Sequence, residues 1–245
     1  ETMERLNNIF SGKATRNAAG VNTGIQFVLA QYNPAGELMD EPGINRVTVE
    51  EVTEGTPPDK YHRFLSQNNA IWPHEKYLNI WLMSETKYPK FWNSITKLCV
   101  PKYRLGSETL PGLSLPPVPS TWVPKVEQIG ILFRMSTFQY FQRSIDATAE
   151  RELVTCIGNY LGLLDTWKIN NSNVNDQCND TFAYGIVNNN GSLGTNSSWS
   201  KEVGSYRFLS ENIMDDPTGT HRSVSKDQAL RMYWVLKNCA GRSMW

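Results

Sequence analysis

Strand-like apolar runs precede the longest amphipathic helix of this sequence, and this order constrains the fold more than any other feature. Each run is rich in β-branched and aromatic residues and is bounded by turn residues, as strands are. The runs cover residues 25–32, 44–52, 77–83 and 129–135. Five prolines between Leu105 and Pro124 predict an extended loop before the last run.

A helix follows the fourth run. Between Glu150 and Gly162 the apolar residues recur at helical spacing, acidic residues favour the N-terminal end, and the glycine is typical of a helix end. The apolar stripe consists of Leu153, Val154, Ile157 and Leu161. Strands followed by a helix predict an α/β (α+β) domain.

The rest of the chain has a different composition. Residues 168–205 contain many Asn, Ser and Gly residues and few apolar anchors, which predicts a long irregular stretch. Ser225 and Gln228 have the spacing of a capping box at the start of a last helix. We therefore predict an N-terminal unit at 1–162 with the sheet and the helix, and a smaller irregular unit at 163–245 that the last helix closes.

The charge balance excludes one class of partner. The 24 basic residues equal the 24 acidic ones, and no cluster of Lys and Arg residues is interleaved with aromatic residues, as a nucleic-acid-binding surface would require. No apolar run approaches the ~20 residues of a transmembrane helix. We expect no nucleic-acid partner and no membrane span within this chain.

The helix has the outline of a metal-protease active site without its side chains. TCIGNYLGLLD, at residues 155–165, fits the spacing H-E-x-x-H-x-x-G-x-x-H, which brings three His ligands and a Glu general base to zinc. Other segments match the same family in order, at residues 23–47, 77–83, 105–112, 178–181, 211–216 and 223–232. The chain resembles the pappalysin-like metzincins, in particular the zinc-dependent metalloproteinase lipoproteins of Bacteroidetes.

This resemblance implies a metzincin-like (zincin) fold with a mixed twisted sheet, an active-site-type helix and a Met-turn at ENIMDD, residues 211–216. It also assigns the altered positions: Thr155, Asn159 and Asp165 stand for the ligands, Cys156 for the general base, and Asp216 for the Tyr after the Met-turn. Gly162 and Met214, which match structural positions of the family, remain. The resemblance therefore implies a scaffold with no catalytic residue.

Zinc is expected for the family, but we predict no bound cofactor here. Asp165 is a legitimate ligand, whereas Thr155 and Asn159 are poor zinc donors and carry no charge. Oxygen atoms of Asn159, Asp165 and Thr155 could instead hold a hard cation, but one carboxylate falls short of the roughly six to eight oxygen ligands that calcium takes. We interpret Thr155 and Asn159 as residues that hydrogen-bond locally in a former cleft.

Cys156 offers a different hypothesis, a cysteine nucleophile activated by one of the three histidines, His62, His74 or His221. It lies in the middle of the helix, away from the N-terminal end that would lower its pKa, so we interpret it as a small buried hydrophobe. We interpret His221, in the loop after the Met-turn, as a solvated residue rather than a ligand.

Two further cysteines could form a disulfide. Cys178 and Cys239 would tie the irregular unit to the last helix, and the oxidising setting of the family makes the bond plausible. In the loop-entropy account such a bond contributes ~4 kcal/mol.

These observations lead to three functional hypotheses. The first is a catalytically inactive metzincin-fold protein, exported as a periplasmic or cell-surface lipoprotein, that binds a protein, peptide or glycan in the former cleft. Its location and its contact with a membrane, through a lipid anchor outside this chain, come from the resemblance alone. The second is an active peptidase with a non-standard metal or cysteine site. The third is a structural domain of a surface assembly.

Overall fold

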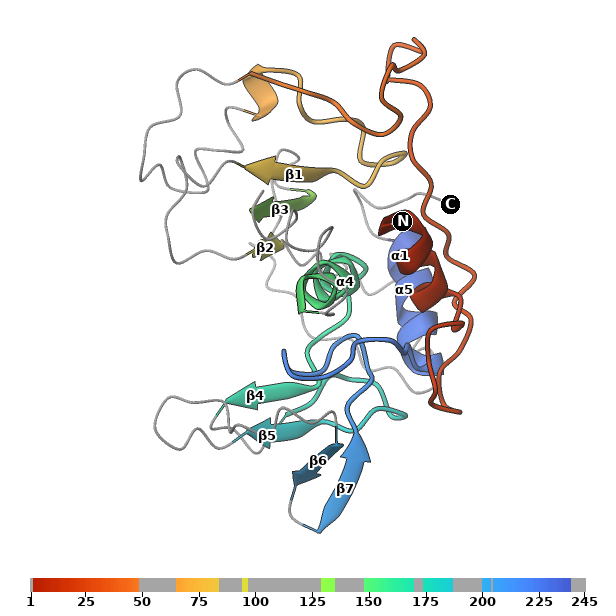
Figure 1. Ribbon diagram of the computed structural model, residues 1–245, viewed down its shortest axis with the longest axis vertical. Helices are drawn as coiled ribbons and strands as arrows, with labels where there is room; N and C mark the ends of the chain where they lie inside the picture. The colour runs from red at the N-terminus through yellow and green to blue at the C-terminus, as the bar shows by residue number, and fades with distance from the viewer. Residues whose placement is uncertain are drawn as a thin grey trace.

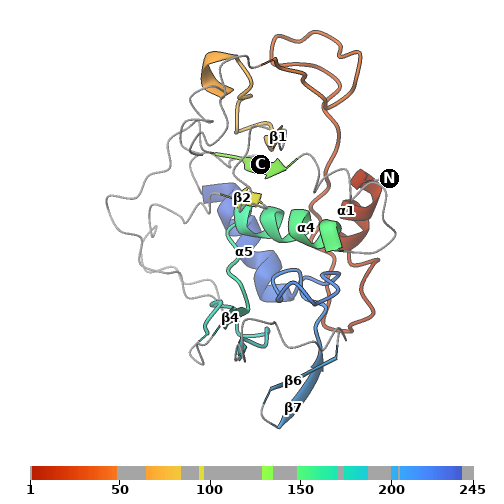
Figure 2. The same ribbon diagram turned by 60° about the vertical axis from the view of Figure 1, so that its left-hand side comes forward.

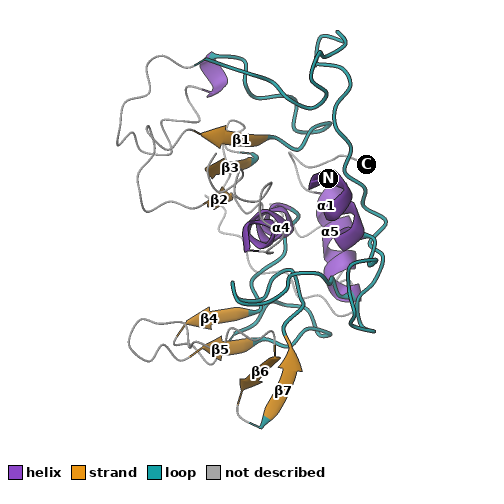
Figure 3. Cartoon of the chain, in the orientation of Figure 1, coloured by secondary structure: helices purple, strands orange, loops and turns teal. Residues whose placement is uncertain are grey.

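The computed structural model describes residues 2–48, 65–83, 94–96, 129–134, 148–169, 174–186, 200–203 and 205–238 (Figure 1). Its helices are α1 (Thr2–Phe10), α4 (Thr148–Tyr160) and α5 (Lys226–Asn238). Its strands are β1 (Ile80–Met83), β2 (Ser94–Thr96), β3 (Ile131–Arg134), β4 (Trp167–Ile169), β5 (Tyr184–Ile186), β6 (Ser200–Val203) and β7 (Tyr206–Leu209). Figure 3 shows how much of the described chain consists of loops between these elements.

The strands form three small sheets. In the first, β3 lies between β1, which runs parallel to it with Ile80 opposite Ile131, and β2, which runs antiparallel. Strands β4 and β5 pair in parallel, and β6 and β7 form an antiparallel pair. Both ribbon views place the first sheet on one side of α4 and the other two sheets on the opposite side (Figures 1 and 2). Helix α4 therefore lies between the sheets.

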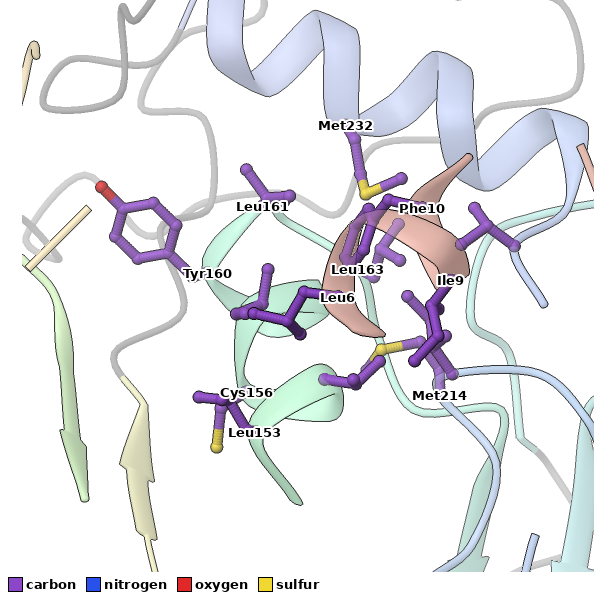
Figure 4. Packing of buried hydrophobic residues seen from close by; sticks show 14 of the residues in the cluster. Leu6, Ile9, Phe10, Leu153, Cys156, Tyr160, Leu161, Leu163, Met214 and Met232 are labelled. Carbon is purple, nitrogen blue, oxygen red and sulfur yellow. The ribbon is translucent and has the colours of Figure 1, made fainter. Parts of the chain in front are cut away.

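The hydrophobic core surrounds α4. The helix buries its apolar stripe, and side chains of α1, α5 and the loop before α5 pack against it (Figure 4). The main contributors are Leu6, Ile9, Phe10, Leu153, Val154, Ile157, Tyr160, Ile213, Met214 and Met232. Since residues of α1 and α5 pack on α4, the position of this helix is fixed by contacts distant in sequence.

The predicted buried strand at 25–32 is wrong. These residues form no strand, with only an isolated bridge between Tyr32 and Leu38, and Val28 is 76% exposed. Their hydrogen bonds explain why: the backbone N–H and C=O of Phe27 pair with the side chain of Asn7, at 2.8 and 2.9 Å, rather than with a strand. Within 44–52, residues 44–48 also have no strand structure, and the others lie outside the described residues. An apolar run does not reveal which backbone will pair with it.

Two other predicted strands are confirmed within their runs, since β1 lies inside 77–83 and β3 inside 129–135. The stretch 168–205 is not wholly irregular, because it contains β5, β6 and most of β4. Such strands of three or four residues leave little periodicity to detect. The Pro-rich stretch 105–124 lies outside the described residues, and the division at Gly162 stays a prediction. Among the described helices, none has the length and apolarity to cross a membrane.

Candidate functional site

The C-terminal end of α4 depends on a glycine conformation and on one contact with α5. Gly162 follows the helix with a φ of +88°, a left-handed conformation that glycine adopts without a steric penalty. The Arg231 side chain of α5, almost fully buried, donates from Nε to the Gly162 carbonyl over 2.5 Å. A cation at the C-terminal end of a helix also complements the helix dipole. The helix therefore ends where the sequence predicts, and α5 holds that end.

The Met-turn loop, residues 211–216, passes directly beside α4. Met214 is fully buried, and a Cβ atom added to Gly158 would lie 2.5 Å from its sulfur. The turn is shaped by Asn212, whose side-chain oxygen accepts the N–H of Met214 over 2.9 Å. A side chain at position 158 would separate the helix from the turn, so the glycine permits this close approach.

Thr155, at the first ligand position, is hydrogen-bonded within the protein. Its hydroxyl oxygen lies 2.8 Å from the Ile213 carbonyl oxygen and 3.0 Å from Nδ1 of His221. Nε2 of the same ring lies 2.9 Å from the Asp216 carbonyl oxygen. His221 is 3% exposed, so the interpretation of a solvated loop residue is wrong. The backbone folds back so that the His221 ring packs against the Met-turn loop. A position in a polar loop of the sequence does not indicate this burial.

Asn159 and Asp165, at the other two ligand positions, interact with each other. The Asn159 amide donates to the Leu163 carbonyl over 3.1 Å and hydrogen-bonds the Asp165 carboxylate. Loss of solvation raises the pKa of Asp165, while Asn159 and the charge of Lys168 act in the opposite direction. Asp165 itself lies at the surface. The amide is thus committed to two protein acceptors.

Cys156, at the general-base position, belongs to the hydrophobic core. The residue is 5% exposed and packs in the cluster around α4, as Figure 4 shows. A thiolate nucleophile needs a partly exposed, positively polarised environment. Cys156 is instead buried among apolar side chains.

Asp216, at the position that the resemblance assigns to the Tyr after the Met-turn, is a buried carboxylate in a polar cluster. Lys201, on β6, forms an ion pair with it, and the hydroxyl of Tyr184, on β5, donates to the carboxylate over 2.7 Å. The backbone N–H and the hydroxyl of Thr218 donate to the other oxygen, at 2.9 and 2.6 Å. Sequence reasoning missed Lys201 and Tyr184, because both lie in the stretch predicted to be irregular.

Asp215 forms a second polar cluster beside the first. Burial raises the pKa of its carboxyl group, and hydrogen bonds from Thr166 and Ser210, at 2.7 and 2.8 Å, counteract this. Burial also raises the pKa of Tyr184, and the nearby charge of Asp215 acts in the same direction. The carboxylates of Asp215 and Asp216 therefore both accept hydrogen bonds from other side chains of the protein.

The donor atoms of Thr155, Asn159 and Asp165, which the resemblance places at the ligand positions, do not fit zinc. They are a hydroxyl, an amide and one carboxylate, whereas zinc in proteins takes thiolate, imidazole and carboxylate ligands. The hydroxyl and the amide are also engaged with protein partners. Within the part of the chain that the structure describes, no three His, Cys, Asp or Glu residues lie together as a metal site would need.

Comparison of structures identifies the architecture. Mature mirolysin of Tannerella forsythia, solved in complex with a cleaved peptide, matches with a TM-score of 0.65 and 18% sequence identity over 99% of this chain and 85% of that chain. The chain has a mirolysin-like (metzincin) fold. Mirolysin in complex with compound 9 matches with a TM-score of 0.64 at the same identity and coverage. No family model and no curated protein matches the sequence.

The segment 178–181 has a structural role in this fold. The Asp180 carboxylate accepts hydrogen bonds from the Ser225 hydroxyl and the Asp227 N–H at the start of α5, at 2.6 and 2.9 Å. The Ser225–Gln228 capping box is confirmed by its two reciprocal bonds, at 3.1 and 3.3 Å. Cys178 is a buried thiol in the same segment. Cys239 lies outside the described residues, so their disulfide stays a prediction.

Proposed function

We propose that this chain is a catalytically inactive metzincin-fold protein, a pseudo-metalloprotease of the bacterial cell envelope. It binds a protein, peptide or glycan through the region of the former active site. The envelope location is supported by the resemblance to Bacteroidetes lipoproteins. Loss of the reaction is supported by the side chains of the site itself.

The observation that carries the proposal is the state of Thr155. A zinc-protease helix directs a free imidazole from this position to the metal. Here the hydroxyl is 2.8 Å from the Ile213 carbonyl oxygen and 3.0 Å from Nδ1 of His221, so it is engaged with two partners of the protein. Cys156, at the general-base position, is a thiol in the hydrophobic core and does not act as a base. Gly162 and Met214, at structural positions of the family, remain, whereas the positions of the ligands and the general base hold other residues.

An exposed aromatic patch next to the site supports ligand binding. Phe182 and Tyr206 are 40% and 65% exposed, with ring centroids 5.7 Å apart. Phe182 packs on Phe208 and stacks on Tyr184, whose hydroxyl reaches Asp216. Exposed aromatic side chains that gather in one place are typical of ligand surfaces. This patch is where we expect the first ligand contacts.

Metal content and cleavage test the proposal together. The natural chain, freed of any tag, is exposed to stoichiometric zinc, washed and analysed by mass spectrometry, with Asp165→Ala as the matched variant. A variant carrying Thr155→His, Asn159→His and Asp165→His, which has three His residues at the ligand positions, is the control that shows whether the assay detects bound zinc. The same proteins are incubated with a peptide library, and cleavage is measured by mass spectrometry.

The proposal expects no retained zinc in the natural chain or in Asp165→Ala and no cleaved peptide. About one equivalent of zinc in the natural chain, lost in Asp165→Ala, would refute it. Cleavage without zinc would instead support the active peptidase with a non-standard site. Binding to peptide or glycan arrays, weakened by Phe182→Ala or Tyr206→Ala, separates a binding protein from a purely structural domain, for which no array signal is expected.

A further inference from the structure

An amine and a carboxyl group lie against each other inside the protein. Lys201, on β6, forms an ion pair with Asp216 of the Met-turn loop, and both side chains are largely buried. The ammonium group lies over the ring of Tyr184, with Nζ 5.6 Å from the ring centroid, and Phe208 packs on that ring at 5.2 Å. Aromatic side chains therefore cover one side of the pair, and burial limits the access of water.

The two oxygen atoms of the Asp216 carboxylate have different partners. Oδ1 accepts the backbone N–H and the hydroxyl of Thr218, at 2.9 and 2.6 Å. Oδ2 accepts the Tyr184 hydroxyl over 2.7 Å and is the oxygen of the ion pair with Lys201. Donors aimed at one oxygen stabilise the negative charge that develops there when the carboxyl carbon is attacked. Oδ1 is thus placed to carry that charge, and Oδ2 is placed to leave.

The hydroxyl of Tyr184 connects the two groups of the pair. Nζ of Lys201 donates to the Tyr184 oxygen over 3.5 Å, and the Tyr184 hydroxyl donates to Oδ2 of Asp216 over 2.7 Å. The backbone N–H of Asp216 also donates to the Tyr184 oxygen, at 3.2 Å, which holds the phenol in place. A hydroxyl within reach of both a donor and an acceptor can pass a proton from the nitrogen to the oxygen.

Burial and proximity both favour a reaction within this pair. Transfer of one proton from Nζ to Oδ2 turns the ion pair into an amine and a carboxylic acid, and burial favours uncharged groups over charged ones. An amine held against a carboxyl carbon reacts as if it were very concentrated, because effective molarities within one molecule reach about 10⁵–10⁸ M. Formation of an amide, which is unfavourable between separate molecules in water, is therefore favoured here.

We propose that Lys201 and Asp216 join in an intramolecular amide bond, with Tyr184 as the proton relay. The Lys201 nitrogen attacks Cγ of Asp216, and Oδ1 carries the negative charge beside Thr218. The bond between Nζ and Cγ forms, and the bond between Cγ and Oδ2 breaks. Nζ gives up two of its three protons, one of them through Tyr184, and Oδ2 leaves with both as water. The reaction needs no oxidant and no other reactant.

This bond ties the β6–β7 hairpin covalently to the Met-turn loop. Lys201 lies in the hairpin and Asp216 in the loop, so the aromatic patch on β7 is held to the body of the protein by more than packing. The inference goes beyond the proposed function, because it concerns a modification of the chain itself and not a ligand.

The mass of the intact natural chain tests the bond. The folded protein is purified, then reduced and denatured, and its measured mass is compared with the mass of the sequence. We expect the natural chain to be lighter by the mass of one water molecule. Lys201→Arg, which keeps a positive charge, is the matched control and should have its full mass. A natural chain of full mass, or a water lost equally from Lys201→Arg, would overturn the proposal.

Peptide mapping of the natural chain locates the bond and depends on no variant. Trypsin does not cleave after a lysine whose side chain is an amide, so the peptide that contains Lys201 should be joined to residues 208–222, which contain Asp216. Fragmentation of the joined peptides should place the bond on Asp216. A free peptide 208–222 in full yield, or a bond on Asp215, would overturn the proposal.

Tyr184→Phe tests the proton relay, since it removes the hydroxyl and keeps a ring that packs on Phe208. Newly made protein is pulse-labelled during expression, and the linked fraction is followed by intact mass. We expect the bond to form about 100-fold more slowly than in the natural chain. A rate within about twofold of the natural one would overturn the relay.

The two proposals fail in different ways. Zinc retained by the natural chain would refute the proposed function, whatever the mass of the chain. A natural chain of full mass would refute the amide bond and leave the proposed function as it stands, because that function rests on Thr155.

Discussion

The Lys201 ammonium and the Asp216 carboxylate form an ion pair whose side chains are 11% and 1% exposed. Tyr184 and Thr218 add hydrogen bonds, so both oxygens of the carboxylate are bound by the protein. A buried charge is tolerated when it is paired and hydrogen-bonded in this way. The pair fastens β6 to the Met-turn loop.

Lys201→Met should destabilise the protein strongly. The change removes the cation and leaves the Asp216 carboxylate buried, so we expect the free energy of unfolding to fall by about 3–5 kcal/mol. Urea denaturation at neutral pH measures it. Asp216→Asn added to Lys201→Met removes the uncompensated charge and should recover part of the loss. A double variant no more stable than Lys201→Met would contradict this account.

Gly162→Ala should cost more than Gly36→Ala. Both glycines have a positive φ, at +88° and +85°, so each alanine is strained by about 1 kcal/mol or more. At Gly162 the added methyl group would also collide with Val235 of α5, whereas nothing lies within 4 Å of it at Gly36. We expect overpacking to add about 1–3 kcal/mol at Gly162 alone. Equal losses of stability for the two variants in thermal unfolding would contradict this prediction and show that α5 moves to make room for the methyl group.

Asp180→Ala should destabilise the start of α5. The carboxylate accepts from the Ser225 hydroxyl and the Asp227 N–H, and a negative charge there complements the helix dipole. We expect a loss of about 1 kcal/mol in the free energy of unfolding. Asp180→Asn, which keeps one acceptor oxygen and removes the charge, should lose less. If the two variants unfold alike, the charge and not the hydrogen bonds carries the effect.

The sequence predicts the elements whose signal is local. Apolar spacing and a glycine locate α4 and its end, and the Ser225–Gln228 spacing locates the start of α5. These features depend on residues within a few positions of one another. The ordered motifs also predict a metzincin-like fold, and the structural comparison finds a mirolysin-like fold over 99% of the chain.

Features that depend on distant contacts could not be predicted in this way. The apolar run 25–32 has the composition of a buried strand, but its backbone pairs with the Asn7 side chain and Val28 faces solvent. His221 lies beside Thr155 because the loop folds back on itself, where the Ile213 N–H donates to the Ser223 carbonyl and the Thr220 N–H to the Ser210 carbonyl. No spacing along the chain encodes its contact with Thr155.

Cys178 should make stability depend on alkaline pH. Burial, with Asp176 acting in the same direction, raises the pKa of the thiol from 9.0 to about 12. The unfolded chain therefore loses this proton first, and the stability that the neutral thiol contributes is present below about pH 9 and is lost as the pH rises toward about 12. In that window the slope approaches about 1.4 kcal/mol per pH unit.

The measurement compares the natural chain with Cys178→Ala. Urea denaturation is recorded from neutral pH into the alkaline window, with a reducing agent present so that Cys178 cannot pair with Cys239. The buried tyrosines Tyr160 and Tyr184, whose pKa values burial also raises, are present in both proteins and cancel in the difference. We expect the difference in the free energy of unfolding to shift in favour of Cys178→Ala above about pH 9. A difference independent of pH would mean that the thiol reaches solvent in the folded protein.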